Sequence, residues 1–347
     1  MAIRIARLVL LVLALAGFAP TPEAKMLRST AERVAVAEDR GYQALVNAAN
    51  AVVAVKVKAL PNARSNETLG EERLGSGVVI GDDGLVLTIG YLIMEADQIE
   101  VTGANGTAVP ASVVAYDHAT GFGLVKTLAK LSAKAIKLGS SAPITQLDRL
   151  MIVTGGDEQT ISIATVVSRR KFAGYWEYLI DGAIFTAPPR LDHSGAALIN
   201  KDGELVGVGS LFVMDAVVPG EKMPGNMFVP VDLLKPVLDE MVRTGAQQAG
   251  RRPWLGVNSL EEDGRVKVMH VNEESPADKA GVVAGDIILS VNGEPVESLE
   301  KFYANLWRKD SPPGSEVRLT LLHGVNLKEV TVRSIDRREF MRHKPTV

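Results

Sequence analysis

The stretch that decides the fold is LGSGVVIGDDGLVLT, residues 74–88. Two short runs of mostly aliphatic residues, at 76–80 and 85–88, flank the turn sequence GDDG at 81–84. Apolar runs of this length, joined by a short turn that contains glycine, are typical of a β-hairpin. The segment therefore predicts two antiparallel strands.

The same pattern continues on both sides of this hairpin. Turn sequences such as GANG (103–106) and NKDG (200–203) separate further short runs with β propensity. The runs lie at 51–59, 98–102, 111–116, 122–126, 149–154, 161–168, 177–180, 196–199 and 204–210. Because helical segments between them are missing, we expect a β-barrel or sandwich and no parallel βα sheet.

A helix and a linker are predicted to end this β-rich region. The helix is expected over 232–244, with Asp232 as its N-cap, Pro236 in its first turn and Gly245 at its end. The polar stretch AQQAGRR at 246–252 follows and is the best domain boundary in the chain.

A compact unit with strands and helices is predicted from 253 to 335. Its expected strands lie at 254–258, 265–271, 287–291, 316–322 and 328–333, and its expected helices lie near 276–280 and 299–307. The basic residues 336–347 are expected to form a loosely held tail.

The N-terminus has the features of an export signal. Two arginines precede a short apolar run at 8–18, and small residues follow, so residues 1–24 are predicted to be a signal peptide. The run is shorter than the roughly 20 apolar residues of a spanning helix. The alternative is a short uncleaved anchor, and Pro22 leaves the cleavage position open. A helical segment is expected over 25–50, and the periplasm or an equivalent exported space is the expected location.

Composition excludes several classes of site. The chain has 347 residues, which is enough for two or three folding units, and a net charge of −3, which does not favour nucleic acid. Cysteine is absent, and the five histidines lack metal-ligand spacing, so neither a disulfide nor a metal site is expected. No cofactor is predicted.

Taken together, these segments resemble the HtrA family of serine proteases over roughly residues 50–333 in consistent order. The resembling segments are 74–88, AYDHATGFGLVK (115–126), DGAIFTAPPRLDHSGAALINKDGELVGV (181–208), FVPVDLLKPVLDEM (228–241), PWLGV (253–257) and SPADKAGVVAGDIILSVNG (275–293). The resemblance implies a mainly β fold, with a chymotrypsin-like double β-barrel at 51–245 followed by a PDZ domain at 253–335.

The resemblance also implies three catalytic positions, and this chain departs from the family at two of them. The family has T-N-x-H-V where this chain reads TIGYL (88–92), so Tyr91 stands at the histidine position. The family has T-D-L-A-L where this chain reads TGFGL, so Gly121 stands at the aspartate position. Ser194 is retained at the nucleophile position, within DHSGAAL in place of G-N-S-G-G-P-L.

These departures predict a catalytically degenerate site. A serine hydroxyl needs a neighbour that accepts its proton and a group that orients this neighbour. Tyr91 is a donor when neutral and has an ordinary pKa near ~10, and Gly121 has no side chain. The family's oxyanion hole uses the N–H of the serine and of the residue two before it. That residue is Asp192, which is less adaptable than glycine and adds negative charge.

Other bases were considered for Ser194. Residues 192–194 spell Asp, His and Ser, but adjacent side chains diverge and cannot form a triad. His118 and Asp117 are better interpreted as a turn histidine and a turn-capping aspartate. Lys126 would form a Ser–Lys dyad only if it faced the site, whereas the resemblance implies that it ends a strand and faces solvent.

The PDZ-like segment has the features of a peptide-binding site. PDZ domains hold a peptide's terminal carboxylate in a loop of backbone N–H groups and add the peptide as an extra strand. Trp254, Leu255, Gly256 and Val257 resemble this loop, where Gly256 permits a close backbone approach and its neighbours supply donors and pocket wall. The alternative is that these residues belong only to the core.

The second wall of the peptide groove is expected from the helix near 299–307. Phe302 and Leu306 have a suitable helical spacing, although core packing is an equal alternative for each. Arg251 and Arg252 are candidates for attracting a carboxylate, with a solvated pair as the alternative.

Three functions remain open from the sequence. The first is an exported pseudoprotease that binds polypeptides or C-termini through its PDZ domain as adaptor, chaperone or regulator in envelope protein quality control. The resemblance implies a homotrimer, or a hetero-oligomer with an active relative, and no membrane span once the signal is removed. The second is a serine endopeptidase that acts on misfolded proteins through Ser194 with a non-standard base. The third is a scaffold in the cell envelope.

Overall fold

The computed structural model describes residues 40–156, 159–246, 251–308 and 310–343. The predicted signal peptide and most of the predicted helical segment lie outside the described residues, and a helix covers residues 40–50. From Val46 onward the chain forms one compact unit. Among the described residues, no helix is long and apolar enough to cross a membrane.

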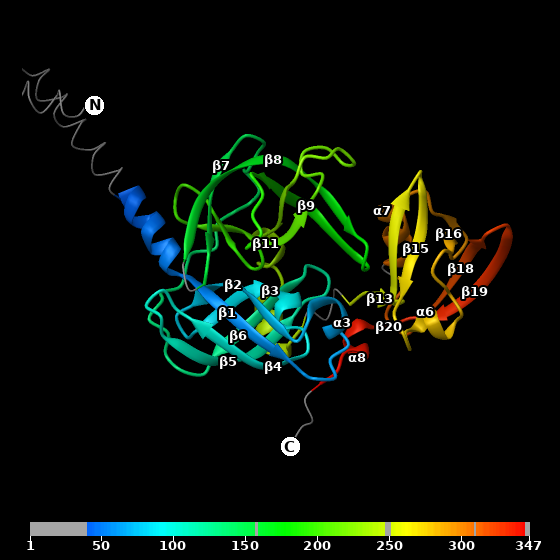
Figure 1. Ribbon diagram of the computed structural model, residues 1–347, viewed down its shortest axis with the longest axis horizontal. Helices are drawn as coiled ribbons and strands as arrows, with labels where there is room; N and C mark the ends of the chain where they lie inside the picture. Colours follow the sequence, from blue (N-terminus) through cyan, green and yellow to red (C-terminus); the bar gives the residue numbers. More distant parts are fainter. Residues whose placement is uncertain (1–39, 157–158, 247–250, 309, 344–347) are drawn as a thin grey trace, which may run out of the picture. The chain divides into compact units, whose positions relative to one another are not determined.

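The first part of this unit is a closed antiparallel β-barrel with strand order β1-β2-β3-β6-β5-β4 (Figure 1). Its strands are β1 (Val52–Ala59), β2 (Glu72–Gly81), β3 (Leu85–Ile89), β4 (Ala96–Thr102), β5 (Ala108–Tyr116) and β6 (Phe122–Thr127). The predicted hairpin is confirmed, because β2 pairs with β3 and Val78 lies opposite Leu87. Two single-turn helices, α3 (Asn66–Leu69) and α4 (Gly90–Ile93), interrupt the strands.

A second closed barrel follows, with strand order β10-β11-β12-β9-β8-β7. Its strands are β7 (Arg149–Thr154), β8 (Thr160–Gly174), β9 (Tyr178–Ala187), β10 (Ala197–Ile199), β11 (Leu205–Val213) and β12 (Gly225–Pro230). Apolar side chains from alternate positions fill its centre, with Ile184, Leu198 and Phe228 fully buried. Both β8 and β9 run beyond their predicted ends, so they form a long hairpin whose tip is residues 175–177.

The helix predicted over 232–244 is wrong in its first half. A 3₁₀ turn, η1 (Val231–Leu233), comes first, and the α-helix α5 begins only after Pro236 and covers Leu238–Thr244. Asp232 therefore does not cap this helix. Its carboxylate instead accepts hydrogen bonds from the N–H groups of Ser141 and Ala142, at 2.7 and 2.9 Å, and so fixes the loop before the second barrel.

The C-terminal domain is built on a five-strand antiparallel path, β14-β15-β16-β18-β19, with β17 also paired to β16. Its strands are β14 (Val257–Glu262), β15 (Arg265–Val271), β16 (Ile287–Val291), β17 (Glu294–Pro295), β18 (Glu316–His323) and β19 (Asn326–Arg333). The helices α6 (Pro276–Lys279) and α7 (Leu299–Leu306) complete the domain. β14 is an edge strand of this sheet, and α7 packs on its core.

The first strand of this domain differs from its predicted range of 254–258. A two-residue strand, β13 (Pro253–Trp254), pairs with β20 (Ile335–Asp336), and the chain turns before β14 begins. The turn is at Gly256, whose φ of +90° is in the left-handed region that glycine tolerates best.

The described part of the C-terminal segment is not a loose tail, contrary to the sequence-based expectation. Its helix α8 (Arg337–Phe340) follows β20, and the N-cap Asp336 accepts from Arg338 N. The Phe340 ring packs against Trp254, with ring centroids 4.6 Å apart. Its main chain is also fixed, because Arg342 N donates to Glu95 Oε1 at 2.7 Å.

Candidate functional site

The loop that carries Ser194 lies between β9 and β10 and is tied to the first barrel. Ser76 N, in β2, donates to the Ser194 carbonyl oxygen at 2.8 Å. Gly195 follows with a φ of +74°, and a Cβ at this position would lie 1.9 Å from the Ser76 carbonyl oxygen. Glycine is therefore required here, and the close approach of β2 fixes the position of Ser194.

Tyr91, in α4, contacts the Ser194 hydroxyl. Its Oη lies 2.8 Å from Ser194 Oγ and 2.8 Å from the carbonyl oxygen of Ser210. A carbonyl oxygen only accepts, so a phenol that donates to Ser210 keeps a lone pair for the Ser194 hydroxyl. Burial raises the pKa of Tyr91 to about 12, although the hydrogen bond with Ser194 acts in the opposite direction. At neutral pH the phenol keeps its proton and takes none from Ser194.

The turn that carries Tyr91 is held by a buried arginine. The Nη1 of Arg73 donates to the carbonyl oxygens of Tyr91 and Met94, at 3.0 and 2.7 Å, and its Nε donates to the Gly70 carbonyl at 3.0 Å. Hydrogen bonds from a charged donor to buried carbonyls are among the stronger ones in proteins. The backbone of α4 is therefore fixed independently of the side chain at position 91.

The space beside Gly121 is filled by Tyr178. Gly121 has a φ of +79°, and a Cβ at this position would lie 2.7 Å from Tyr178 Oη. Tyr178, the first residue of β9, is buried and donates to the Thr120 carbonyl at 2.7 Å. A side chain at position 121 would therefore collide with the tyrosine ring.

The carboxylate of Asp192 is held by neighbouring donors. Arg190 Nε donates to its Oδ1 at 2.9 Å, and the hydroxyls of Thr154 and Thr160 donate to its Oδ2 at 3.2 and 3.1 Å. Burial raises the pKa of Asp192, but the hydrogen bonds from Arg190 and Thr160 and the charge of Arg190 outweigh it and hold the pKa below its ordinary value. The negative charge expected at this position is present and is paired with Arg190.

A cavity of about 270 Å³ lies beside Tyr91. Its lining includes His193 and Ser210 from the second barrel, and Trp254 and Phe340 from the C-terminal region. Rings and polar groups from several parts of the chain therefore line the space beside Tyr91.

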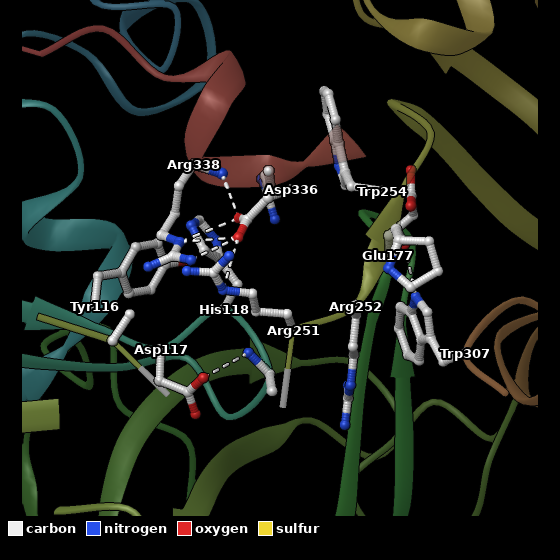
Figure 2. A pocket seen from close by; sticks show the side chains of 14 residues that line it. Tyr116, Asp117, His118, Glu177, Arg251, Arg252, Trp254, Trp307, Asp336 and Arg338 are labelled. Carbon is white, nitrogen blue, oxygen red and sulfur yellow. Dashed lines mark hydrogen bonds and ion pairs between the residues drawn. The ribbon is translucent and has the colours of Figure 1, made fainter. Parts of the chain in front are cut away.

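A second cluster of polar contacts lies at the start of the C-terminal domain, around Glu177, a residue that Figure 2 labels near Trp254. The N–H groups of Leu255, Gly256 and Val257 all donate to the carboxylate of Glu177, at 3.0, 2.7 and 3.0 Å. A Cβ at Gly256 would lie 2.3 Å from Ser275 Cβ, so this turn requires glycine. These are the N–H groups that the sequence predicted to receive a peptide's terminal carboxylate. In this structure they hold a side chain of the same protein.

The other residues predicted for peptide binding have different surroundings. Phe302 and Leu306 are fully buried in the core of the C-terminal domain. The guanidinium of Arg252 lies 4.4 Å from the ring centroid of Trp307. Arg251 lies 3.6 Å from an oxygen of Asp336. These contacts of the two arginines are thus with Trp307 and Asp336, and not with the carboxylate of Glu177.

Two protein families match this chain. A trypsin-like peptidase domain matches residues 75–208, and a PDZ domain matches residues 253–333. The serine endoprotease DegS of Haemophilus influenzae is 29% identical over 279 residues, which cover 77% of this chain and 78% of that protein. A probable periplasmic serine endoprotease, DegP-like, of Pseudomonas putida is 27% identical, and the match covers 65% of this chain. The chain spans about half the length of that relative, at 48%.

Solved structures agree with these matches. The serine endoprotease from Yersinia pestis has a TM-score of 0.52 at 25% identity, with 85% of this chain and 97% of that chain covered. The HtrA-type protease AlgW with tripeptide has a TM-score of 0.51 at 24% identity, with 88% and 98% covered. This chain belongs to the HtrA family. The predicted fold, a trypsin-like double barrel followed by a PDZ domain, is confirmed.

In this HtrA protein the alternative bases have other partners. The Nδ1 of His193 lies 3.1 Å from the Arg190 carbonyl, and burial lowers the pKa of this histidine. The His118 ring packs on Tyr116, with centroids 4.1 Å apart, and burial lowers its pKa well below the ordinary value. Lys126 forms an ion pair with Asp83. These contacts do not direct any of the three side chains to Ser194.

His118 lines a different, small cavity of about 40 Å³, where Figure 2 shows it close to Asp336 and Arg338. Asp117 caps its own turn, as predicted, because its Oδ1 accepts from Ala119 N at 3.2 Å. Among the residues that the structure describes, no group of three or more acidic, histidine or cysteine side chains is arranged to hold a metal ion.

Three residues of this HtrA protein were not predicted from the sequence: Glu177 and Tyr303 at the PDZ domain, and Tyr178 beside Gly121. The Tyr303 hydroxyl donates to the Gly174 carbonyl at 2.6 Å and accepts from Glu177 N at 3.1 Å. The only sequence signal is the segment GYWEY at 174–178, a hairpin tip with three aromatic residues and one acid. Its docking depends on tertiary structure, which local patterns do not encode.

Proposed function

We propose that this HtrA protein is an exported pseudoprotease that binds polypeptides or protein C-termini through its PDZ domain. Its role would be that of an adaptor, chaperone or regulator in envelope protein quality control. The observation that carries the proposal is the contact of Tyr91 with Ser194, because a neutral phenol gives the nucleophile no base. The periplasmic names of its DegP-like relatives support an exported location.

The chemistry around Ser194 supports this proposal at each step of acyl transfer. Tyr91 would have to ionise before it accepted a proton, and its pKa of about 12 leaves roughly one phenol in 10⁵ ionised at pH 7. Tyr178 fills the space in which an orienting carboxylate would stand next to Gly121. Loss of the base alone costs about 10⁶ in turnover in a serine protease of another fold.

A fluorophosphonate probe tests the absence of an activated serine. We expect the purified protein to remain unlabelled under conditions that label an active HtrA protease completely, and casein to remain intact over long incubation. Ser194→Ala is the matched control for background labelling. Stoichiometric labelling of the wild type that this variant abolishes would contradict the proposal.

A peptide array tests the binding function. Fluorescein-labelled decapeptides with varied last three residues are presented once with a free C-terminal carboxylate and once as amides. We expect selective binding of some free-carboxylate members and loss of this binding as amides. A protein that bound neither set, or both equally, would fit the scaffold function and would exclude C-terminal recognition.

Assembly forms part of the same proposal. We expect a homotrimer, or a mixed oligomer with an active HtrA relative. Light scattering after size-exclusion chromatography distinguishes these states, first for the protein alone and then with the relative added. A monomer in both samples would exclude this part of the proposal.

The second candidate is a serine endopeptidase that acts on misfolded proteins. Two observations favour it: Ser194 is retained in the expected loop, and the matched relatives are named as endoproteases. It requires a base other than Tyr91. Casein turnover by the wild type, lost in Ser194→Ala and retained in Tyr91→Phe, would identify this function.

A further inference from the structure

The tip of the β8–β9 hairpin contacts the PDZ domain where that fold binds peptides. PDZ domains take an extended peptide along a sheet edge and hold its terminal carboxylate in a backbone loop. In this protein β14 is the sheet edge, and its Ser259 N donates to the Tyr175 carbonyl at 2.8 Å. The carboxylate loop beside it is filled by Glu177. Main-chain and carboxylate contacts of a bound peptide are therefore both reproduced by residues 175–177.

The helix α7 forms the opposite side of this contact. Tyr303, from α7, bonds the main chain of the hairpin tip at Gly174 and Glu177. Nearby, Lys171 of β8 forms an ion pair with Glu300 of α7 at 2.6 Å. Ala173 and Leu179, on either side of the tip, pack against the apolar core of the PDZ domain. The tip thus occupies the groove between β14 and α7.

Glu177 is an unusual residue to find in this position. Its φ of +57° lies in the left-handed region, which is strained for a residue with a side chain. Its side chain is buried, and burial raises its pKa to about 7, against the effect of the three N–H donors and of Arg337. A carboxylate in such surroundings needs donors, and the loop at 255–257 supplies them.

We propose that Glu177 is an internal ligand of the PDZ domain, a side-chain carboxylate that takes the place of a peptide C-terminus. The β8–β9 hairpin then occupies the groove in the resting protein. An external C-terminus binds only after it displaces the hairpin tip, so its apparent affinity is reduced by the fraction of molecules in which the groove is free. The displacement step rests on the proposed C-terminal recognition, whereas the occupancy of the loop by Glu177 does not.

Hydrogen–deuterium exchange of the full-length protein tests the occupancy without any peptide. We expect exchange at the amides of residues 255–257 to rise at least tenfold in Glu177→Ala, because the carboxylate that protects them is removed. Glu221→Ala, which removes an exposed glutamate of the second barrel, is the matched control and should leave these amides unchanged. Unchanged exchange in Glu177→Ala would overturn the proposal.

A second variant guards against a folding defect in the first. Tyr303→Phe keeps the buried ring and removes only the hydroxyl that bonds the hairpin tip. We expect it to raise exchange at the same three amides as well as at residues 174–177. Wild-type exchange at these positions in Tyr303→Phe would count against a hairpin held in the groove.

Peptide binding then tests the displacement. The probe is the tightest-binding free-carboxylate decapeptide from the array, titrated into wild type, Glu177→Ala and Glu221→Ala. We expect Glu177→Ala to bind it about tenfold or more tightly than the other two proteins. Equal affinities would overturn displacement. Failure of all three proteins to bind any array member would refute C-terminal recognition and with it displacement, while the exchange result would still decide occupancy.

Discussion

Two tyrosines lie around Ser194. Tyr91 stands at the position where the HtrA resemblance implies a histidine, and Tyr178 lies beside Gly121, which stands at the position of the aspartate. The Tyr178 ring is buried and the Tyr91 ring is half-buried, and the two hydroxyls donate to main-chain carbonyls, at Thr120 and Ser210. The two rings therefore fill space around Ser194. Restoring histidine and aspartate at 91 and 121 would leave Tyr178 in the way.

Replacement of Gly121 tests this packing. We expect Gly121→Ala to lower the free energy of unfolding by about 2–4 kcal/mol, because it combines left-handed backbone strain with overlap against Tyr178. Gly106→Ala is the matched control, since its φ of +76° is similar and a Cβ there meets nothing within 4 Å. The control should lose only about 1 kcal/mol.

Urea unfolding of the two variants, followed by circular dichroism, gives the difference directly. The same two variants are then made in a Tyr178→Phe background, which lacks the hydroxyl that lies nearest to the new Cβ. The difference between their free energies of unfolding should then be smaller. Equal losses in Gly121→Ala and Gly106→Ala would show that the ring does not fill this space.

At residue scale the sequence predicted where the chain departs from its family, but not what fills the resulting space. Tyr91 and Gly121 were identified by local motifs. Tyr178 and Glu177 lie 57 and 56 residues after Gly121 in the sequence. The contact of Tyr178 with the site and that of Glu177 with the PDZ loop form only when the barrels and the PDZ domain have folded. Local sequence patterns carry no information on such pairs.

Among the elements, η1 shows how a single carboxylate organises a loop. Asp232 accepts from Ser141 N, Ala142 N and the Ser141 hydroxyl. Burial raises the pKa of Asp232, but the hydrogen bonds from Lys235 and Ser141 outweigh it and hold the pKa well below its ordinary value of 3.8. The folded protein therefore releases this proton more readily than the unfolded chain.

This shift gives a prediction with a definite sign. The stability that ionised Asp232 contributes is fully present above pH 3.8, the unfolded value, and is lost as pH falls below it towards the folded value. We expect Asp232→Asn to lower the free energy of unfolding by about 1–2 kcal/mol at pH 7. The gap between wild type and variant should narrow below about pH 4.

Urea titrations at pH 7, 5 and 3.5 measure this gap. Asp181→Asn, an exposed carboxylate on β9, is the control and should change little at any of the three pH values. A gap for Asp232→Asn that stayed constant down to pH 3.5 would exclude a depressed pKa.

Element boundaries were predicted well where the hydrophobic pattern sets them and poorly where tertiary contacts do. The β2–β3 hairpin follows from its apolar runs and its turn. The start of α5 was misplaced, because Asp232 has a capping sequence but its carboxylate is used by another loop. The extension of β8 was missed, since residues 169–174 read RRKFAG, three basic residues followed by Phe, Ala and Gly, which is a weak strand pattern.

For the whole molecule, the C-terminal segment is the largest difference from expectation. Its basic composition suggested a loose end, yet β20 pairs with β13 and α8 packs beside Trp254. The Arg64 guanidinium, near α3, lies 4.0 Å from the Phe340 ring centroid. One ring of the tail therefore contacts residues that are far apart in the chain, a result that composition does not predict.

Truncation of this ring tests how much the tail stabilises the fold. We expect Phe340→Ala to lower the free energy of unfolding by about 1–2 kcal/mol, because it removes the contact with Trp254 and the cation–π contact with Arg64. Because the ring is half-buried, its removal costs less stability than the removal of a core phenylalanine would. Differential scanning calorimetry of the full chain measures the change.

Val325→Ala is the control for this variant, since Val325 is 93% exposed in the turn between β18 and β19. It should alter stability by less than about 0.5 kcal/mol. If Phe340→Ala behaved like this control, the segment would be the loose tail that its composition suggests.

The hydrogen bonds of Arg73 bear on how substitutions at position 91 are tolerated. Two of them run to the carbonyl oxygens of Tyr91 in α4 and of Met94 directly after it, and a third runs to the Gly70 carbonyl. None of the three uses a side chain of the turn. A mutation at position 91 therefore leaves the local backbone anchored. The chemistry beside Ser194 can thus change with the side chain at position 91 while the fold of the first barrel is kept.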